Sequence, residues 1–284
     1  MTLFYPVITS RDYLKSENKK CYLWELLDNQ PKGFLTALGR STNRVIPQSY
    51  HVIYDCGAWS YRNNESPPID AQKAIVQYDS IAKQGDIVAA PDHMLLPGTN
   101  IDDRRFFNRR EATNFIKFVG NRFIPMGTIH GLDLKEQIEY GKFLTQELGF
   151  EYIAVGGLAA RSRQKSFVVN SVAAIKQSFP DANIHVFGIS APNYVKVWKE
   201  LEITSFDGSS YFLKALTKGI YLDHDLIEYK IKNLQMGEIP ICNCAACLYV
   251  RKQNEDTRMF GNSLRNIGRA IHNLNMLMGV LECI

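Results

Sequence analysis

The sequence predicts an α/β protein with a (β/α)8 TIM-type barrel and a small C-terminal subdomain. Short β-rich runs alternate with helical patterns through most of the chain. Polar or glycine residues follow strand after strand, and three cysteines lie close together after this alternation has ended. The length of 284 residues suits one barrel, which typically needs about 250 residues. An open doubly wound sheet is the alternative that the same alternation allows.

Eight runs have the composition of strands: Tyr5–Ile8, Gly33–Leu38, His51–Asp55, Asp86–Ala90, Phe123–Ile129, Tyr152–Val155, Ile184–Phe187 and Ile203–Phe206. Helical spacing of apolar residues falls between them, over Ala71–Gln84, Arg110–Val119, Leu134–Leu148, Phe167–Phe179 and Tyr194–Leu201. This order of elements indicates parallel β-α units.

The residues just beyond the predicted strands are mostly Asp, Gly or His: Asp55, Asp92, His130, Gly156, Gly188 and Asp207. The carboxyl ends of barrel strands meet on one face, where the active sites of such barrels form. Turn chemistry alone also favours Asp and Gly after a strand, so a purely structural interpretation stays open. Three aspartates together with a Gly-Gly pair favour a site.

Composition and charge exclude several classes of protein. A net charge of +4 permits a polyanionic partner without requiring one. We expect no membrane span, because no apolar run approaches the ~20 residues that one needs. The N-terminus turns polar by Ser10 and lacks a basic region, so we expect no signal peptide. Three clustered and three scattered cysteines suit a reducing cytoplasm.

The pattern changes near Met236, which predicts a barrel over residues 1–235 and a subdomain over 236–284 that ends in a long helix. Cys242, Cys244 and Cys247 form a C-x-C-x-x-C run, and His272 is the one histidine downstream. A closed Cys3His set is typical of a structural zinc site. Three buried, unreactive cysteines are the alternative.

This C-x-C-x-x-C run, followed by Ile-His-Asn-Leu, resembles the zinc-binding end of the tRNA-guanine transglycosylase superfamily. Members of that superfamily are (β/α)8 barrels that exchange a guanine in a polynucleotide for a 7-deazaguanine. Tyr-Asp-Cys-Gly-Ala-Trp at 54–59 is similar to the superfamily's Asp-Ser-Gly-Gly-aromatic signature. The resemblance implies that Asp55 is the general acid/base and that Trp59 stacks on the base. Cys56 and Ala58 depart from the signature.

Two further motifs resemble the superfamily's base-binding elements. Asp92, after Ala-Ala-Pro, matches the aspartate that accepts from the base's N–H edge, and a carboxylate suits the amide and amino donors of guanine. The Gly-Gly-Leu-Ala run supplies Gly156, Gly157 and Leu158 as the base-binding loop. His130 stands where the superfamily usually has Gln, and residues 160–162 lack its Val-Gly-Glu. Both departures affect residues that select the base, and therefore bear on which 7-deazaguanine the protein would bind.

The last motifs imply the second half of the site. Val-Phe-Gly-Ile-Ser at 186–190 would place Gly188 at the base and Phe187 as the second face of a sandwich with Trp59. Phe-Asp-Gly places Asp207 at the nucleophile. The chemistry needs two carboxylates, because an anion can trap the oxocarbenium-like state at C1′ while Asp55 moves the proton.

The polymer is predicted from what surrounds these motifs. Residues 211–216 lack the arginine pair with which the tRNA enzymes follow the nucleophile, and we expect no RNA-binding extension after Ile284. Arg104, Arg105, Arg109 and Arg110 flank two phenylalanines, which suits a nucleic-acid backbone with unstacked bases. A solvated loop with a hydrophobic plug is the alternative for this segment.

The sequence therefore predicts a base-exchange transglycosylase that inserts a preQ0-like 7-deazaguanine into DNA through a covalent aspartyl-glycosyl intermediate. It would resemble the short DNA-guanine transglycosylase branch found in phages and mobile modification systems. DNA, a free 7-deazaguanine and a structural Zn2+ are the expected partners, in the cytoplasm, which includes that of a phage host. A homodimer is left open. The alternatives are a tRNA-guanine enzyme of the queuine or archaeosine type, a non-catalytic RNA-binding subunit, and an ordinary barrel glycosidase.

Overall fold

The computed structural model describes residues 2–8, 13–16, 19–39 and 46–282. The chain divides into two compact units. The first comprises Met1–Tyr5, Gly33–Ile189 and Val197–Asp207, and the second comprises Pro6–Lys32, Ser190–Lys196 and Gly208–Ile284.

Eight strands form the sheet of the first unit: β1 (Leu3–Pro6), β4 (Gly33–Ala37), β5 (His51–Asp55), β6 (Ile87–Ala89), β7 (Ile124–Ile129), β8 (Tyr152–Val155), β9 (Asn183–Val186) and β10 (Ser205–Gly208). Neighbouring strands from β4 to β10 pair in parallel, in sequence order, and β1 adjoins β10. All eight overlap runs predicted from the sequence, although β1 begins two residues before its predicted run and β10 begins two residues after the start of its own. The prediction of a TIM-type barrel is confirmed.

The sheet curls until its two edge strands nearly meet. A Cβ atom at Gly33 of β4 would lie 2.9 Å from Cε1 of Tyr5 on β1 and 2.0 Å from the carbonyl oxygen of His51. A glycine is needed there because any side chain would collide with both neighbours. Side chains alternate along the strands. Gly127 of β7 faces outward onto Leu144 and Phe150, whereas other positions face the barrel interior.

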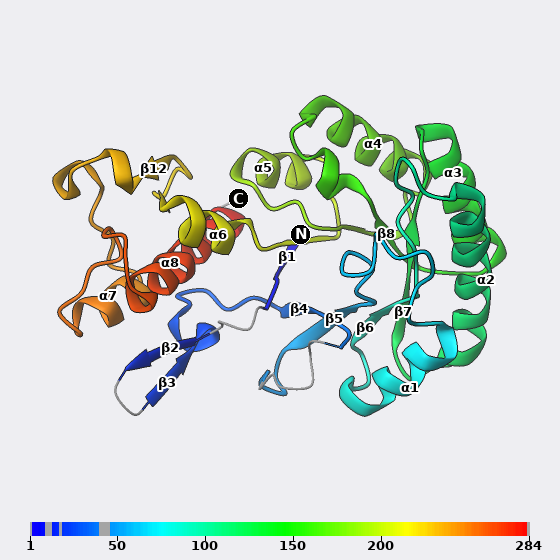
Figure 1. Ribbon diagram of the computed structural model, residues 1–284, viewed down its shortest axis with the longest axis horizontal. Helices are drawn as coiled ribbons and strands as arrows, with labels where there is room; N and C mark the ends of the chain where they lie inside the picture. The colour runs from blue at the N-terminus through cyan, green and yellow to red at the C-terminus, as the bar shows by residue number, and fades with distance from the viewer. Residues whose placement is uncertain (1, 9–12, 17–18, 40–45, 283–284) are drawn as a thin grey trace. The chain divides into compact units, whose positions relative to one another are not determined.

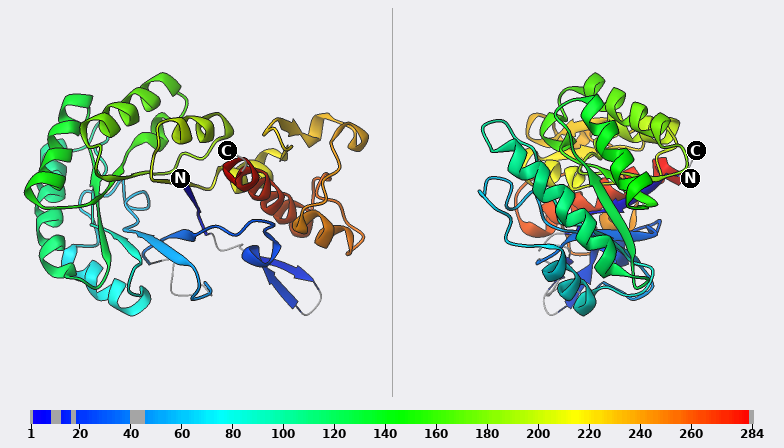
Figure 2. Two further views of the ribbon diagram at one scale, coloured as in Figure 1. Left: turned by 180° about the vertical axis from the view of Figure 1, so that it is seen from behind. Right: turned by 90° about the vertical axis from the view of Figure 1, so that its right-hand side faces the viewer.

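Helices cover the outer side of the sheet: α1 (Ala71–Ile81), α2 (Ile101–Val119), α3 (Leu134–Lys142), α4 (Lys165–Ser178) and α5 (Pro192–Glu200). Figure 1 shows α1 to α4 along the outside of strands β5 to β8, and Figure 2 shows this layer from behind and from the side. A π-helical turn at Phe143–Glu147 continues α3. The side chains of Asp70, Asn100 and Asp133 cap α1, α2 and α3 by accepting from backbone N–H groups.

The predicted start of α2 at Arg110 is wrong, because this helix begins at Ile101. Asn100 caps it, and Asp102 and Asp103 lie in its first turn, where the helix dipole favours negative charge. The basic segment 104–110 is therefore helical rather than a loop. Because a helix spreads its side chains around its axis, the four arginines of this segment do not all face the same surroundings.

The second unit is organised around α8 (Ser263–Glu282), which contacts α6 (Ser210–Leu213), α7 (Ala245–Arg251), β2 (Tyr13–Ser16) and β11 (Ile220–Leu222). The hairpin partners are β3 (Lys19–Tyr22) for β2 and β12 (Glu228–Lys230) for β11. Asn273 on α8 accepts from the N–H of Leu222 and donates to the carbonyl of Ile220. The predicted division into residues 1–235 and 236–284 stays a prediction about folding units. Within the described ranges, no helix has both the length and the apolarity to span a bilayer.

Candidate active site

Three aspartates come together at the carboxyl ends of the barrel strands. Asp55 ends β5, Asp92 follows β6, and Asp207 lies in β10. Burial raises the pKa of Asp55 to about 7, and the charges of Asp92 and then Asp207 add to the shift, while a hydrogen bond from the Gly57 backbone opposes it. A carboxyl group with this pKa can donate and accept a proton near neutral pH, as general acid/base catalysis requires.

Asp207 is buried and held at one of its two oxygens. Its Oδ1 accepts from the backbone N–H of Gly188 at 2.8 Å and lies 3.1 Å from Nε2 of His185. His185 is fully buried in β9. Gly188 follows β9 with a φ of +72°, a conformation that glycine adopts without strain. The carboxylate therefore has donors that come from the neighbouring strand and its loop.

Asp92 has a partner at each oxygen. Its Oδ1 accepts from the thiol of Cys56 at 2.9 Å, and its Oδ2 lies 2.6 Å from Nε2 of His130. Burial and the nearby carboxylates raise the pKa of Cys56, which keeps the thiol protonated as a donor. Tyr61 donates to the backbone carbonyl of Asp92 at 3.1 Å. Each carboxylate oxygen can accept two hydrogen bonds, so Asp92 retains acceptor capacity for a ligand.

The absence of a side chain at Gly156, in the Gly-Gly loop, leaves space for the imidazole of His130. A Cβ atom at Gly156 would lie 2.9 Å from Cε1 of His130 and 2.7 Å from Cγ2 of Thr128. Gly157 has a φ of +74° and is exposed, whereas Leu158 is buried and anchors the short helical turn that follows. The loop therefore serves two purposes, because it frees the imidazole beside Asp92 and presents backbone atoms at Gly157.

The two predicted stacking residues lie outside the core. Trp59 is 50% exposed, and the guanidinium of Arg62 lies 4.3 Å from the centre of its ring. Phe187 is half-buried, with its ring edge-on to His185 at a centroid distance of 4.7 Å. Both rings are thus available to a ligand, and one face of Trp59 already carries a cation.

A family profile described as queuine tRNA-ribosyltransferase matches residues 112–284, which is more than half of the chain. The chain belongs to the queuine tRNA-ribosyltransferase family. It is also similar to a DNA-guanine transglycosylase from Salmonella montevideo, with 23% identity over 179 residues, 58% of this chain and 42% of that protein. The chain therefore spans about two fifths of the length of that relative.

This member of the queuine tRNA-ribosyltransferase family has a buried cluster that could hold a metal ion. The ligand atoms of Cys242, Cys244, Cys247 and His272 all lie within 4.8 Å of one another. Nε2 of His272 lies 2.7 Å from the carbonyl oxygen of Leu222, so this nitrogen carries the hydrogen. Nδ1 is then bare and faces the sulfurs of Cys244 and Cys247 at 3.4 and 3.5 Å. A carbonyl that orients a histidine in this way is typical of metal sites.

The helix α2 separates the predicted nucleic-acid-binding arginines. Arg104 is buried, and its guanidinium donates to the carbonyls of Arg62, Asn64 and Met94. The prediction that Arg104 contacts a nucleic-acid backbone is wrong, because these contacts hold it inside and use its donors. Arg105, Arg109 and Arg110 remain accessible along the same helix.

The remaining three arginines differ in their partners. Arg105 pairs with Glu136 at 2.6 Å and with Asp102 at 2.9 Å, and Arg110 pairs with Glu111 at 2.6 Å. Arg109 lies over the ring of Phe143 at 4.4 Å and that of Tyr140 at 5.5 Å. Within the part of the chain that is described, no carboxylate lies within 4.0 Å of Arg109. This arginine is therefore best placed to receive an anion.

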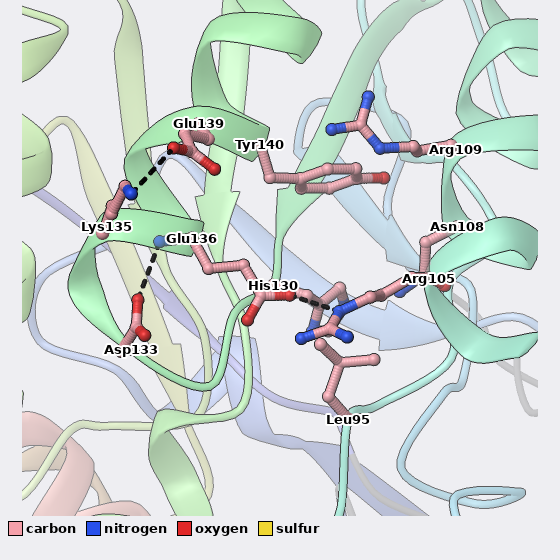
Figure 3. A pocket seen from close by; sticks show the side chains of 10 residues that line it. All are labelled: Leu95, Arg105, Asn108, Arg109, His130, Asp133, Lys135, Glu136, Glu139 and Tyr140. Carbon is pink, nitrogen blue, oxygen red and sulfur yellow. Dashed lines mark hydrogen bonds and ion pairs between the residues drawn. The ribbon is translucent and has the colours of Figure 1, made fainter. Parts of the chain in front are cut away.

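A cavity of about 390 Å³ lies between α2 and α3, and Figure 3 shows the side chains that line it. Arg109 extends over Tyr140 on one side, and Arg105 reaches Glu136 on the other. His130 also lines this cavity. The cavity therefore adjoins the hydrogen-bonded pair of His130 and Asp92. The volume lies at the lower end of the range for small-molecule sites, about 300–1,000 Å³.

Sequence reasoning missed several residues of this site. Cys56 was noted only as a departure from a motif and Tyr61 was not singled out, although both bond to Asp92. His185 and Ser205 lie in predicted strands at positions that face the barrel interior. Their signal was available, because a polar residue inside a buried strand needs a partner.

The raised pKa of Asp55 makes the stability of the fold depend on pH. The carboxyl group of the unfolded chain ionises near its usual pKa of about 4, whereas that of the folded chain ionises near 7. The free energy of unfolding therefore falls as the pH rises from about 4 to about 7, and the whole loss is present above that interval. We expect Asp55→Asn to raise the melting temperature at about pH 8 and to have little effect at about pH 4.5.

Thermal unfolding followed across this range is the measurement. Asp70→Asn is the control, because its carboxylate caps α1 and has a lowered pKa, so it should give no gain at high pH. An equal gain from Asp55→Asn at both ends of the range would contradict the assignment.

Proposed function

We propose that this chain exchanges guanine in DNA for a 7-deazaguanine through a covalent glycosyl-enzyme intermediate. One observation carries the proposal. A held carboxylate, Asp207, and a carboxyl group with a pKa of about 7, Asp55, lie at the same end of a barrel of this family. These are the two groups that a double displacement at C1′ needs.

The reaction would proceed in two balanced steps. In the first, Asp207 forms a bond to C1′ while the bond from C1′ to N9 of guanine breaks, and the departing base takes the proton of Asp55. In the second, the incoming base gives its N9 proton to Asp55 and attacks C1′, and the ester bond to Asp207 breaks. One N-glycosidic bond replaces another, so the exchange needs no external energy source. Asp55 acts as acid and then as base, as in retaining glycosidases.

The base would lie among residues of five strand ends, those of β5 to β9. Asp92 accepts from its N–H edge with the lone pairs that Cys56 and His130 leave free. The backbone at Gly156, Gly157 and Leu158 approaches the other edge, next to His130. Trp59 and Phe187 cover its faces beside Gly188, and the base replaces Arg62 on Trp59 or takes the opposite face. Stacking on an aromatic ring is worth about 1–3 kcal/mol per base.

DNA is the polymer that we propose, with tRNA as the second candidate. The relative from Salmonella montevideo is described as a DNA-guanine transglycosylase, which supports DNA, and the family description supports tRNA. Arg105 and Arg109 on α2 would contact phosphates beside the cavity that His130 also lines, and Arg110, which is exposed on the same helix, would contact a further phosphate. The non-catalytic subunit has less support, because such a subunit would not need Asp55 held at a pKa of about 7.

The nucleophile is tested by a protein–DNA adduct that survives denaturation. Asp207→Asn should lower adduct formation by about 10⁴-fold or more, because an amide cannot attack C1′. Asp55→Asn should form some adduct but should not complete the exchange. Adduct is measured on denaturing gels, with Asp181→Asn as a control, since Asp181 is exposed and precedes β9 at its amino end. Undiminished adduct in Asp207→Asn would refute the role of Asp207.

We also propose that the Cys3His cluster binds one structural Zn2+ per chain. Three thiolates and one histidine leave no open position, and zinc would join α7 to α8 within the second unit. Five described cysteines are free of disulfides, which fits the cytoplasmic location that belongs to this proposal.

Metal analysis of the purified protein tests the zinc assignment. We expect about one Zn2+ per chain, and Cys244→Ser should lose most of it and lower the melting temperature. Cys21→Ser is the matched control, because Cys21 is a buried free cysteine of the same unit outside the cluster. Folded wild-type protein of full stability without metal would rule the site out.

The role of α2 in binding the polymer is tested through salt. Arg109→Gln should weaken binding to all DNA sequences and reduce the slope of log K against log salt by about 1, because one phosphate contact is lost. Fluorescence anisotropy with a labelled single strand measures the slope. Arg122→Gln is the control, because Arg122 lies just beyond the far end of α2 and pairs with Asp79. Equal slopes for Arg109→Gln and the wild-type protein would exclude this surface.

A further inference from the structure

Four polar side chains form a continuous chain inside the barrel. Oη of Tyr152 on β8 lies 2.6 Å from Oγ of Ser205, which lies 2.8 Å from Nδ1 of His185. Nε2 of His185 lies 3.1 Å from Oδ1 of Asp207. All four residues are buried, and they come from three neighbouring strands. Barrel interiors are usually filled by Val, Ile and Leu, so this polar chain needs a reason.

The chemistry of the two ends sets the direction of every hydrogen bond. A carboxylate only accepts, so Nε2 of His185 must carry a hydrogen. Burial raises the pKa of Tyr152 and keeps its hydroxyl protonated. Among the described residues, Ser205 Oγ is the partner seen for that hydroxyl, so Tyr152 donates to Ser205 and Ser205 donates to Nδ1. In this arrangement His185 has a hydrogen on Nε2 and accepts at Nδ1, and every group in the chain has a partner.

The surroundings hold the imidazole ring in this orientation. The ring of Phe187 meets it edge-on at a centroid distance of 4.7 Å, and Tyr5 meets it edge-on at 6.5 Å. Ser205 fixes one nitrogen while Asp207 fixes the other. Rotation of the ring would break both hydrogen bonds of a fully buried side chain, which makes this orientation strongly preferred.

We propose that His185 is a positioning residue for Asp207 and that Oδ2 of Asp207 is the oxygen that bonds to C1′. The N–H of Gly188 and Nε2–H of His185 both bond Oδ1. No hydrogen bond to Oδ2 is seen within the described ranges, so Oδ2 keeps its lone pairs for C1′. The bond from Oδ2 to C1′ forms as the bond from C1′ to N9 breaks, and His185 neither gains nor loses a proton. This role rests on the proposed function of Asp207.

The tautomer of His185 can be tested without substrate. In ¹⁵N spectra of histidine-labelled protein, the resonances that disappear in His185→Gln identify this residue. We expect a protonated Nε2 and a bare Nδ1, and Ser205→Ala should increase the population with hydrogen on Nδ1. A hydrogen on Nδ1 alone in the wild-type protein would overturn the inference, whether or not the protein exchanges bases.

Rates of adduct formation test the function of this hydrogen bond. His185→Leu removes the donor, and His185→Asn retains an amide only near Ser205, so both should slow adduct formation by about 10²-fold. His185→Gln places an amide N–H near the position of Nε2 and should retain the rate to within about tenfold. The KM for the free base should stay close to the wild-type value in His185→Gln, whose donor to Asp207 is preserved.

Matched controls separate this inference from the proposed function. Tyr152→Phe removes the end of the chain and should slow the reaction, whereas Tyr54→Phe removes a buried hydroxyl that bonds outward to the carbonyl of Ile81 and should not. If wild-type protein forms an adduct that depends on Asp207 while His185→Leu matches its rate, the positioning role fails and the proposed function stands. If wild-type protein forms no adduct, the proposed function fails. The ¹⁵N spectra then still test whether the hydrogen of His185 is on Nε2.

Discussion

The burial of three aspartates close together at one end of the barrel governs the rest of this site. Burial favours the neutral form of a carboxyl group, and a second negative charge nearby strengthens that preference. Asp92 has a thiol and an imidazole as partners, and Asp207 has a backbone N–H and an imidazole. Burial, and after it the charges of Asp92 and Asp207, raise the pKa of Asp55 to about 7. Burial and like charge together thus give Asp55 a carboxyl group that can exchange a proton near neutral pH.

The barrel provides these partners from strands that are distant in sequence but adjacent in the sheet. On one side, β5 to β8 supply Cys56, His130 and the glycine that makes room for the imidazole. On the other, β8 to β10 supply the polar chain that ends at Asp207. Parallel strands in sequence order make both groupings possible, because each strand end is flanked by the preceding and following ones. In the proposed function, the scaffold therefore determines which carboxylate would carry the proton and which is held fixed.

The sequence predicted this scaffold well, because strand runs and helical spacing are local signals. All eight barrel strands and the cluster of Cys242, Cys244, Cys247 and His272 were foreseeable. The start of α2 was not, because its first turns are charged and lack apolar periodicity. The burial of Arg104 depends on carbonyls about 40 residues away in the sequence, at Arg62 and Asn64. The partners of Asp92 and Asp207 likewise arise from strand neighbours, which no local pattern encodes.

The central claim is that this arrangement of carboxylates exchanges bases in a polynucleotide. Incorporation of labelled guanine tests it most directly, with single-stranded DNA, duplex DNA and tRNA offered separately to the wild-type protein. Extrusion of the target base costs less from a single strand than from a duplex. We expect label to enter DNA, with single strands at least as reactive as duplex. Label in tRNA alone would overturn the choice of polymer, and label in none of the three would contradict base exchange itself.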